Sequence, residues 1–229
     1  MNQLHKQKCY SCSLQERCIF KLLTVEQKQL LDSKKVFTKK KAGAVIAYER
    51  YHANTFFVIA KGIAKVVKQV NEDKELVISL KTVGDFAGLE AIEPNGIYKT
   101  STICITETEF CNVPGNLIVQ LLKGNEAVFN FICHQFSLAT SGILERTMDL
   151  AGSSAQRRLS NALLLLYDNS GRENNSIQIK REELVGIVGV SRETVSRLLS
   201  AMKKKGLISF KDHSIKLLKP VKLRQLATA

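Results

Sequence analysis

Three cysteines near the N-terminus are the residues whose type and spacing could most clearly do chemistry. Cys9, Cys12 and Cys18 have C-x2-C-x5-C spacing, and thiolates so close in sequence are typical ligands of zinc or of an iron–sulfur cluster. A tetrahedral site needs a fourth ligand, and the spacing alone does not distinguish zinc from a cluster. A thiol-redox catalyst is disfavoured because no βαβ pattern surrounds the Cys-x2-Cys pair. Cys104, in a strand-like run, and Cys133, in a helix-like run, are predicted to be small core residues.

The composition is that of a globular chain with a proper core, since 45% of its 229 residues are hydrophobic and 24% are charged. The N-terminus lacks the apolar stretch of a secretion signal, so we expect a cytoplasmic protein whose clustered thiols stay reduced. The longest apolar run, residues 162–167, is far too short to span a membrane, and no membrane partner is expected.

The net charge of +13 is spread unevenly along the chain. Residues 153–229 hold 15 Lys and Arg against 6 Asp and Glu, whereas residues 41–152 hold 10 against 12. A basic end joined to a near-neutral middle favours a polyanion-binding module attached to something else. A merely solubilising basic surface is the alternative.

The hydrophobic pattern changes from strands to helices along the chain. Between residues 36 and 113, short runs rich in branched and aromatic residues alternate with glycine turns, which is typical of an antiparallel roll or barrel. From Asn125 to Leu150 the period becomes 3 and 4, which predicts one long helix. Its expected dimer seam, interrupted by Arg146, consists of Phe129, Ile132, Phe136, Ala139, Ile143 and Leu150. The seam could pair with a second copy in a two-fold dimer or pack on its own roll.

The basic end contains a helix–turn–helix pattern. A short helix over Arg181–Val188 is followed by Gly189 for a sharp turn, by Val190 as an apolar plug, and by Ser191 as the N-cap of a second helix. The second helix has an apolar face of Val195, Leu198, Leu199 and Met202. The following segment, LISFKDHSIKLL, predicts a β-hairpin wing.

The second helix carries polar residues suited to reading DNA on the side opposite its apolar face. Arg192, Glu193, Ser196 and Arg197 are the predicted base-reading residues, and Lys203 and Lys204, with Lys205, are predicted to contact phosphates. A dimer would present two such helices to an inverted repeat whose half-sites lie about 34 Å apart. We find no nucleophile–base pair and no phosphate-cradling glycine loop, so no enzyme is expected.

This order of elements resembles the CRP/FNR regulators, and the segments FFVIAKGIAKVVK, TVGDFAG and VSRETVSRLL carry the resemblance. It implies an α+β chain with a cysteine-rich arm (1–24), a β-roll like a cyclic-nucleotide-binding jelly roll (25–124), a dimerisation helix (125–152) and a winged helix–turn–helix domain (153–229). RNA polymerase is then an expected partner, besides double-stranded DNA and a second copy of the chain.

Within that family the chain looks closest to the oxygen-responsive FNR branch. The branch holds a [4Fe–4S] cluster with three N-terminal cysteines, which Cys9, Cys12 and Cys18 match, and with one distant cysteine. Cys111, in TETEFCNVP, matches the distant one. The resemblance therefore implies a regulator that senses oxygen, or redox or nitrosative state, through a cluster. The alternative is a small-molecule or cyclic-nucleotide receptor whose cysteines hold structural zinc.

The sequence departs from both branches at identifiable positions. Cyclic-AMP-binding relatives have a glutamate one place before Glu90 and Arg-Ser where this chain has Lys99-Thr100, so the nucleotide site looks degraded. Oxygen-switching members have an acidic residue where this chain has Ile143, so we expect pairing even without the cluster. Arg192 is typical of the cyclic-AMP branch, so we expect a half-site intermediate between TTGAT-like and TGTGA-like sequences.

Overall fold

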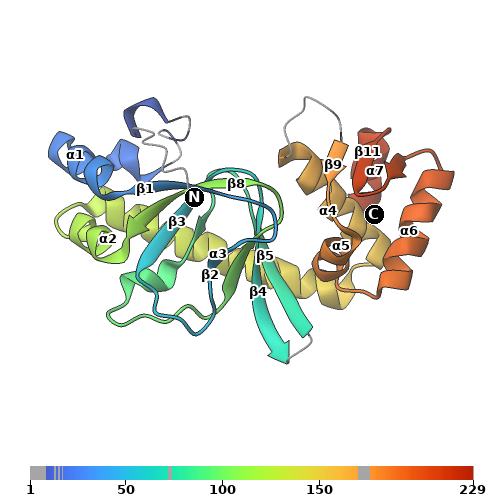
Figure 1. Cartoon of the computed structure of the whole chain (residues 1–229), viewed down its shortest axis with the longest axis horizontal. Coiled ribbons are helices and arrows are strands. Elements are labelled where there is room, and N and C mark those ends of the chain that lie inside the picture. Colours follow the sequence, from blue (N-terminus) through green and yellow to red (C-terminus); the bar gives the residue numbers. More distant parts are fainter. Residues whose placement is uncertain are drawn as a thin grey trace. The chain divides into compact units, whose positions relative to one another are not determined.

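The computed structural model describes residues 9–12, 14, 16, 18–71, 74–169 and 176–228. The chain divides into two compact units (Figure 1). The described residues up to Lys68 form the first unit together with Ser79–Ile143, and Gln69–Ile78 with Leu144–Ala229 form the second. The boundaries of the four segments expected from the sequence stay a prediction.

The N-terminal arm folds into short turns before the first helix. Two 3-10 helices, η1 (Cys9–Ser11) and η3 (Ile19–Leu22), precede α1 (Val25–Lys34). Thr24 is the N-cap of α1 and forms a capping box with Gln27, in which each side chain accepts a hydrogen bond from the other residue's backbone N–H. Such a box satisfies two N–H groups that a helix start would otherwise leave without a partner.

Two four-stranded antiparallel sheets follow, as the strand-like runs predicted. One has the order β1-β8-β3-β6 and the other β2-β7-β4-β5. The strands are β1 (Val36–Lys40), β2 (Val45–Ala47), β3 (Thr55–Lys61), β4 (Ala64–Asn71), β5 (Lys74–Lys81), β6 (Phe86–Ala87), β7 (Ser101–Cys104) and β8 (Thr108–Pro114). The 3-10 helix η4 (Leu89–Ile92) follows β6.

Side chains of β3 alternate between two hydrophobic cores, because successive residues of a strand point to opposite faces. Phe57 and Ile59 belong to one core inside the roll. Phe56 and Val58 belong to a second core, which also contains the arm residues Ile19, Phe20 and Leu23. The central strand is therefore buried on both faces, and the arm covers one of them.

Two helices follow β8. The first, α2 (Gly115–Leu122), is strongly amphipathic and buries Leu117, Ile118 and Leu121. The second, α3 (Glu126–Gly152), is the long helix that the 3-and-4 spacing predicted. By length and composition α3 could cross a membrane, and 11% of its most apolar window is buried among the described residues. One such helix is weak evidence for a membrane span, because a helix that pairs with a second copy can have the same composition.

The predicted dimer seam is only partly exposed along α3. Phe129, Phe136 and Ile143 are 54%, 46% and 47% exposed. Ile132, by contrast, is 4% exposed and belongs to the core shared with the arm, so its place in a free seam is corrected. The next residue, Cys133, is exposed, so the expectation that it is a core residue was wrong. Ala139 and Leu150 are half-buried.

The second unit contains the helix–turn–helix and its wing. After α4 (Ala155–Asn169) come β9 (Ser176–Gln178), α5 (Arg181–Val188), α6 (Arg192–Lys204), β10 (Ile208–Lys211) and β11 (Ser214–Leu217). The three strands form one sheet of order β10-β11-β9. A final helix, α7 (Pro220–Thr228), packs on α4 and was not expected from the sequence. The order of β-rich domain, long helix and helix–turn–helix confirms the predicted fold class.

Ile132→Ala is expected to lower the free energy of unfolding by about 2–5 kcal/mol, because it empties a filled place in the chain's own core. Ile143→Ala should cost less than about 0.5 kcal/mol at concentrations where the chain is monomeric. Urea unfolding followed by circular dichroism checks both values. A larger loss for Ile143→Ala than for Ile132→Ala would contradict the placement of Ile132.

Candidate metal centre and nucleic-acid interface

The alternation of β8 decides where Cys111 lies. Phe110 points into the roll and is almost fully buried, so Cys111 faces the opposite side of the sheet. There it packs against the core that contains Cys9, and Cys12 and Cys18 pack against the same core. The three arm cysteines and the strand cysteine, 93 or more positions apart in sequence, are thus brought to one face of the sheet.

All six cysteines carry free thiols, and burial shapes the chemistry of the clustered ones. Burial raises the pKa of Cys9, Cys18 and Cys111, that of Cys111 to about 12. Charge on Cys111 acts on Cys9, and charges on Cys18 and Cys12 act on Cys111, which links the four sulfurs electrostatically. At neutral pH the thiols of Cys9, Cys18 and Cys111 therefore stay protonated, and metal ligation would have to displace their protons.

A buried lysine and an aspartate flank the cysteines. The backbone N–H of Cys9 donates to Asp32 Oδ1 at 2.7 Å, and Lys35 Nζ lies 3.4 Å from the same oxygen. The Lys35 side chain is only 7% exposed. Its ammonium lowers the pKa of Cys9 and Cys111 and so offsets part of the rise that burial causes. Asp32 therefore ties the arm to the end of α1, and Lys35 supplies positive charge beside two of the sulfurs.

The four sulfurs are not arranged around one point. Within the part of the chain that the structure describes, no group of three or more His, Cys, Asp or Glu side chains is placed to hold a single metal ion. The cysteines share a core without forming a compact tetrahedron. Cys104 lies elsewhere, fully buried in β7 as predicted.

The helix–turn–helix has the geometry expected from its sequence. Gly189 ends α5 in the left-handed conformation with φ 70°, which favours glycine. Ser191 caps α6, its hydroxyl accepting from Thr194 N at 3.3 Å. The predicted apolar face of α6, Val195, Leu198, Leu199 and Met202, is buried.

The predicted base-reading residues lie on the outer side of α6. Arg192, Glu193 and Arg197 are exposed and Ser196 is half-buried, while Lys203 and Lys204 are exposed in the last turn. Two contacts were not foreseen: Arg192 Nη2 lies 3.2 Å from Glu182 Oε1, and Lys203 Nζ lies 4.8 Å from the centre of the Phe210 ring in the wing. Such exposed pairs are weak, so a stronger partner can displace them.

The segment that binds nucleotides in cyclic-AMP-binding relatives is occupied by internal contacts here. Glu90 Oε1 accepts a hydrogen bond from Lys99 N at 3.2 Å. Lys68 Nζ donates to Lys99 O at 2.9 Å and lies 2.6 Å from Glu49 Oε1. The Glu90 carboxylate and the backbone N–H and C=O of Lys99 therefore have partners within the chain.

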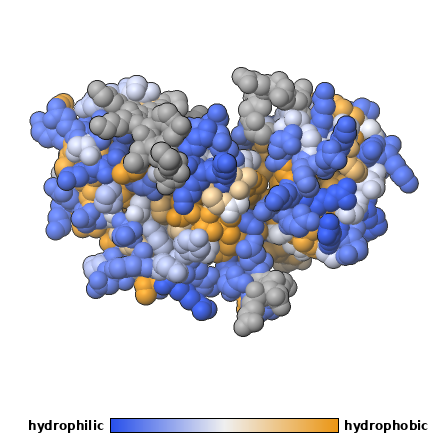
Figure 2. Space-filling model, viewed as in Figure 1, coloured by the Kyte–Doolittle hydropathy of each residue, from blue (hydrophilic) through white to orange (hydrophobic). Residues whose placement is uncertain are grey.

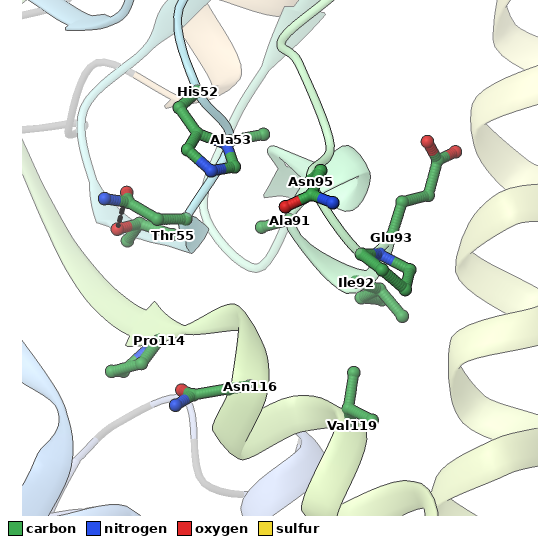
Figure 3. A pocket seen from close by; sticks show the side chains of 12 residues that line it. His52, Ala53, Thr55, Ala91, Ile92, Glu93, Asn95, Pro114, Asn116 and Val119 are labelled. Carbon is green, nitrogen blue, oxygen red and sulfur yellow. Dashed lines mark hydrogen bonds between the residues drawn. The ribbon is translucent and has the colours of Figure 1, made fainter.

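A separate pocket of about 610 Å³ lies in the first unit (Figure 3). It is lined by residues 52–55 before and at the start of β3, by residues 91–95 in and after η4, and by Pro114, Asn116 and Val119 before and in α2. Its walls are mostly apolar, with the carboxamides of Asn54, Asn95 and Asn116 among them. None of the predicted site residues lines it, and no sequence motif indicated it.

Hydrophilic side chains cover much of the surface that is visible in Figure 2.

Comparison with known proteins matches two domain families. Residues 37–125 match the cyclic nucleotide-binding domain, and residues 157–226 match the Crp-like helix-turn-helix domain. The cAMP-activated global transcriptional regulator CRP of Salmonella typhimurium is 26% identical over 171 residues, which is 72% of this chain and 81% of that protein. The protein of the same name from Haemophilus influenzae is 25% identical over 179 residues, 74% and 78% of the two chains.

Solved structures share the fold. FixK2 from Bradyrhizobium japonicum superposes with a TM-score of 0.73 at 18% identity, covering 85% of this chain and 98% of that one. A transcriptional regulator of the CRP/FNR family from Thermus thermophilus gives a TM-score of 0.71 at 22% identity, covering 84% and 98%. The two CRP proteins and the Thermus thermophilus protein are named as transcriptional regulators.

Asp32→Ala should loosen the arm, because it removes the carboxylate that accepts the Cys9 N–H bond. A hydrogen bond to a charged group contributes about 1.5–3 kcal/mol, so tryptic cleavage within the arm should accelerate roughly tenfold or more. Limited proteolysis of the native protein measures this. Glu107→Ala is the control, since its carboxylate contacts only Lys39 among the ion pairs described. Equal cleavage rates in the two variants would show that Asp32 does not anchor the arm.

Proposed function

We propose that the chain, whose two halves match the cyclic nucleotide-binding domain and the Crp-like helix-turn-helix domain, is a homodimeric DNA-binding transcription regulator of the CRP/FNR type. It senses oxygen, or redox or nitrosative state, through a [4Fe–4S] cluster. The observation that carries the proposal is the gathering of Cys9, Cys12, Cys18 and Cys111 on one core. Four thiols form the ligand set that such clusters use.

Four cysteines can hold either a cluster or a single zinc ion, and the resemblance to the FNR branch favours the cluster. A mononuclear zinc site places four ligands on one ion, with each sulfur about 2.3 Å from it. A cluster distributes its cysteines over several iron atoms, and the C-x2-C-x5-C spacing with the distant Cys111 matches the cluster-binding branch in the resemblance described above. When bound, the cluster would supply one-electron chemistry and sensitivity to oxygen or nitric oxide. The chain itself contributes burial, the Lys35 charge and the anchoring of the arm by Asp32.

The paired form would use the exposed side of α3, where Phe129, Phe136 and Ile143 lie. Regulators of this family bind DNA and act as dimers. Two copies of α6 could then enter successive major grooves of an inverted repeat, with RNA polymerase as the further partner and the cytoplasm as the place of action. Since Ile143 is apolar, pairing is expected to weaken but not to vanish when the arm is displaced.

A cyclic-nucleotide or other small-molecule receptor with structural zinc is the second candidate, favoured by the match to the cyclic nucleotide-binding domain. The first candidate is supported by Lys99, which stands where cyclic-AMP-binding relatives have arginine and lacks its bidentate fork, and by Glu90, whose carboxylate is already bonded to the backbone N–H of Lys99. Titration calorimetry with cyclic AMP separates the two. Binding at micromolar concentration would favour the receptor.

Protein purified without air is expected to be brown, with about four iron and four sulfide per chain. Cys111→Ser should abolish the colour and most of the iron, because it removes the ligand that the roll contributes. Cys104→Ser and Cys133→Ser are matched controls that should retain both. A colourless protein with one zinc per chain, or iron retained in Cys111→Ser, would refute the cluster.

Arg192→Ala should reduce the preference for one guanine in each half-site by ~1–3 kcal/mol, because a guanidinium can bind both acceptors of guanine. On DNA, the Arg192 guanidinium would leave the Glu182 carboxylate and bind the guanine instead. Binding assays on an inverted repeat and its single-base variants measure the loss. Lys204→Ala is the control and should weaken all sequences alike, with the salt slope reduced by about 1. A uniform loss for Arg192→Ala would exclude direct readout by this side chain.

A further inference from the structure

Asn125, the residue directly before α3, contacts three segments of the first unit. Its Nδ2 donates to Leu22 O in η3 at 3.1 Å and to Gln27 Oε1 in α1 at 3.0 Å. Its Oδ1 accepts from Val128 N, in the first turn of α3, at 3.2 Å. One side chain therefore joins the arm, α1 and α3.

The arm side of this contact is firmly defined. Gln27 Oε1, which accepts from Asn125, also accepts from Thr24 N at 3.1 Å in the capping box. Leu22 lies four residues after Cys18, at the end of the 3-10 helix that Cys18 precedes. Any displacement of the arm that moves η3 removes an acceptor from Asn125.

The α3 side leads directly to the exposed face. Val128 is fully buried in the core shared with the arm. Phe129 N donates to Asn125 O at 3.1 Å, and Phe129 is the first large hydrophobic residue exposed along α3. Asn125 thus fixes the start of the helix on which Phe129 and Phe136 are displayed. Losing its N-cap would cost about 1 kcal/mol and fray this turn.

From this geometry we infer that Asn125 is a positioning residue that couples the cysteine arm to the first turn of α3, and thereby to the strength of chain pairing. The inference rests on the pairing through α3 in the proposed function, but it does not require any metal. When the arm is held, Nδ2 has one acceptor in η3 and one in α1, and Oδ1 accepts from Val128 N. A displaced arm removes the Leu22 acceptor, and the side chain can then leave the cap.

Asn125→Asp separates capping from coupling. Aspartate is as good an N-cap as asparagine and suits the positive end of the helix dipole, so α3 should begin at the same residue. A carboxylate cannot donate to Leu22 O or Gln27 Oε1, so the link to the arm and the link to α1 are both lost. Asn125→Ser, which keeps a capping oxygen but no amide, is a second variant of the same design. Asn169→Asp is the matched control, because Asn169 Nδ2 donates to Leu165 O at 2.8 Å in the second unit.

The test is a double-mutant cycle on the full chain, with the dimer dissociation constant measured by sedimentation. Asp32→Ala should loosen the arm whether or not a metal is bound, because it removes the acceptor of the Cys9 N–H. It should weaken pairing about fivefold or more when Asn125 is present, and by less than about twofold in the Asn125→Asp or Asn125→Ser chain. The Asn169→Asp chain should keep the full effect. Equal weakening in all backgrounds, or no weakening by Asp32→Ala in any, would overturn the inference.

A second readout separates this inference from the proposed function. Hydrogen exchange of the amides of residues 126–132 should be accelerated by Asp32→Ala in the Asn125 chain only, whether or not the chain pairs. A chain that lacks iron and sulfide, or stays monomeric, contradicts the proposed function, but it leaves the exchange result to decide the coupling. Identical exchange of these amides with and without Asp32→Ala would refute it.

Discussion

Burial of the N-terminal arm against the outer face of the β1-β8-β3-β6 sheet is the constraint on which the rest of the first unit depends. The alternation of β3 and β8 sends Phe57 and Phe110 inward and leaves Val58 and Cys111 to face the arm. The same core receives Val128 and Ile132 from α3. Arm, sheet and long helix therefore share one apolar layer, and a change in any of them alters the packing of the others.

The same burial sets the electrostatic terms of the cysteine site. Thiolates are unfavourable in this layer, as the raised pKa of Cys111, about 12, expresses. The Lys35 ammonium offsets part of that cost, and a positively charged metal group would offset more. A site of this kind is coupled to folding of the arm, because the ligands meet only when the arm lies on the sheet. Under the proposed function, the chain would convert occupancy of the site into order of a segment that touches the pairing helix.

The sequence predicted those parts whose signals are local. The bounds of α5 and the start of α6 followed from Gly189 and Ser191, and the strands followed from branched runs between turns. What it could not supply depends on tertiary contact. A heptad pattern does not say which side of α3 meets its own roll, so Ile132 was expected to be free but is buried, and Cys133 was expected to be buried but is exposed. Asp32 lies 23 residues from Cys9, and Asn125 lies 103 from Leu22. Neither pair has a motif, and α7 lies outside the helix–turn–helix pattern that identified α5 and α6.

X-ray absorption at the iron edge of the anaerobic protein tests the central claim most directly, namely that the four clustered cysteines act as one ligand set. A first shell of sulfur alone, with iron atoms in the second shell, is the result that the account predicts. A first shell dominated by oxygen or nitrogen, or iron without an iron neighbour, would contradict it.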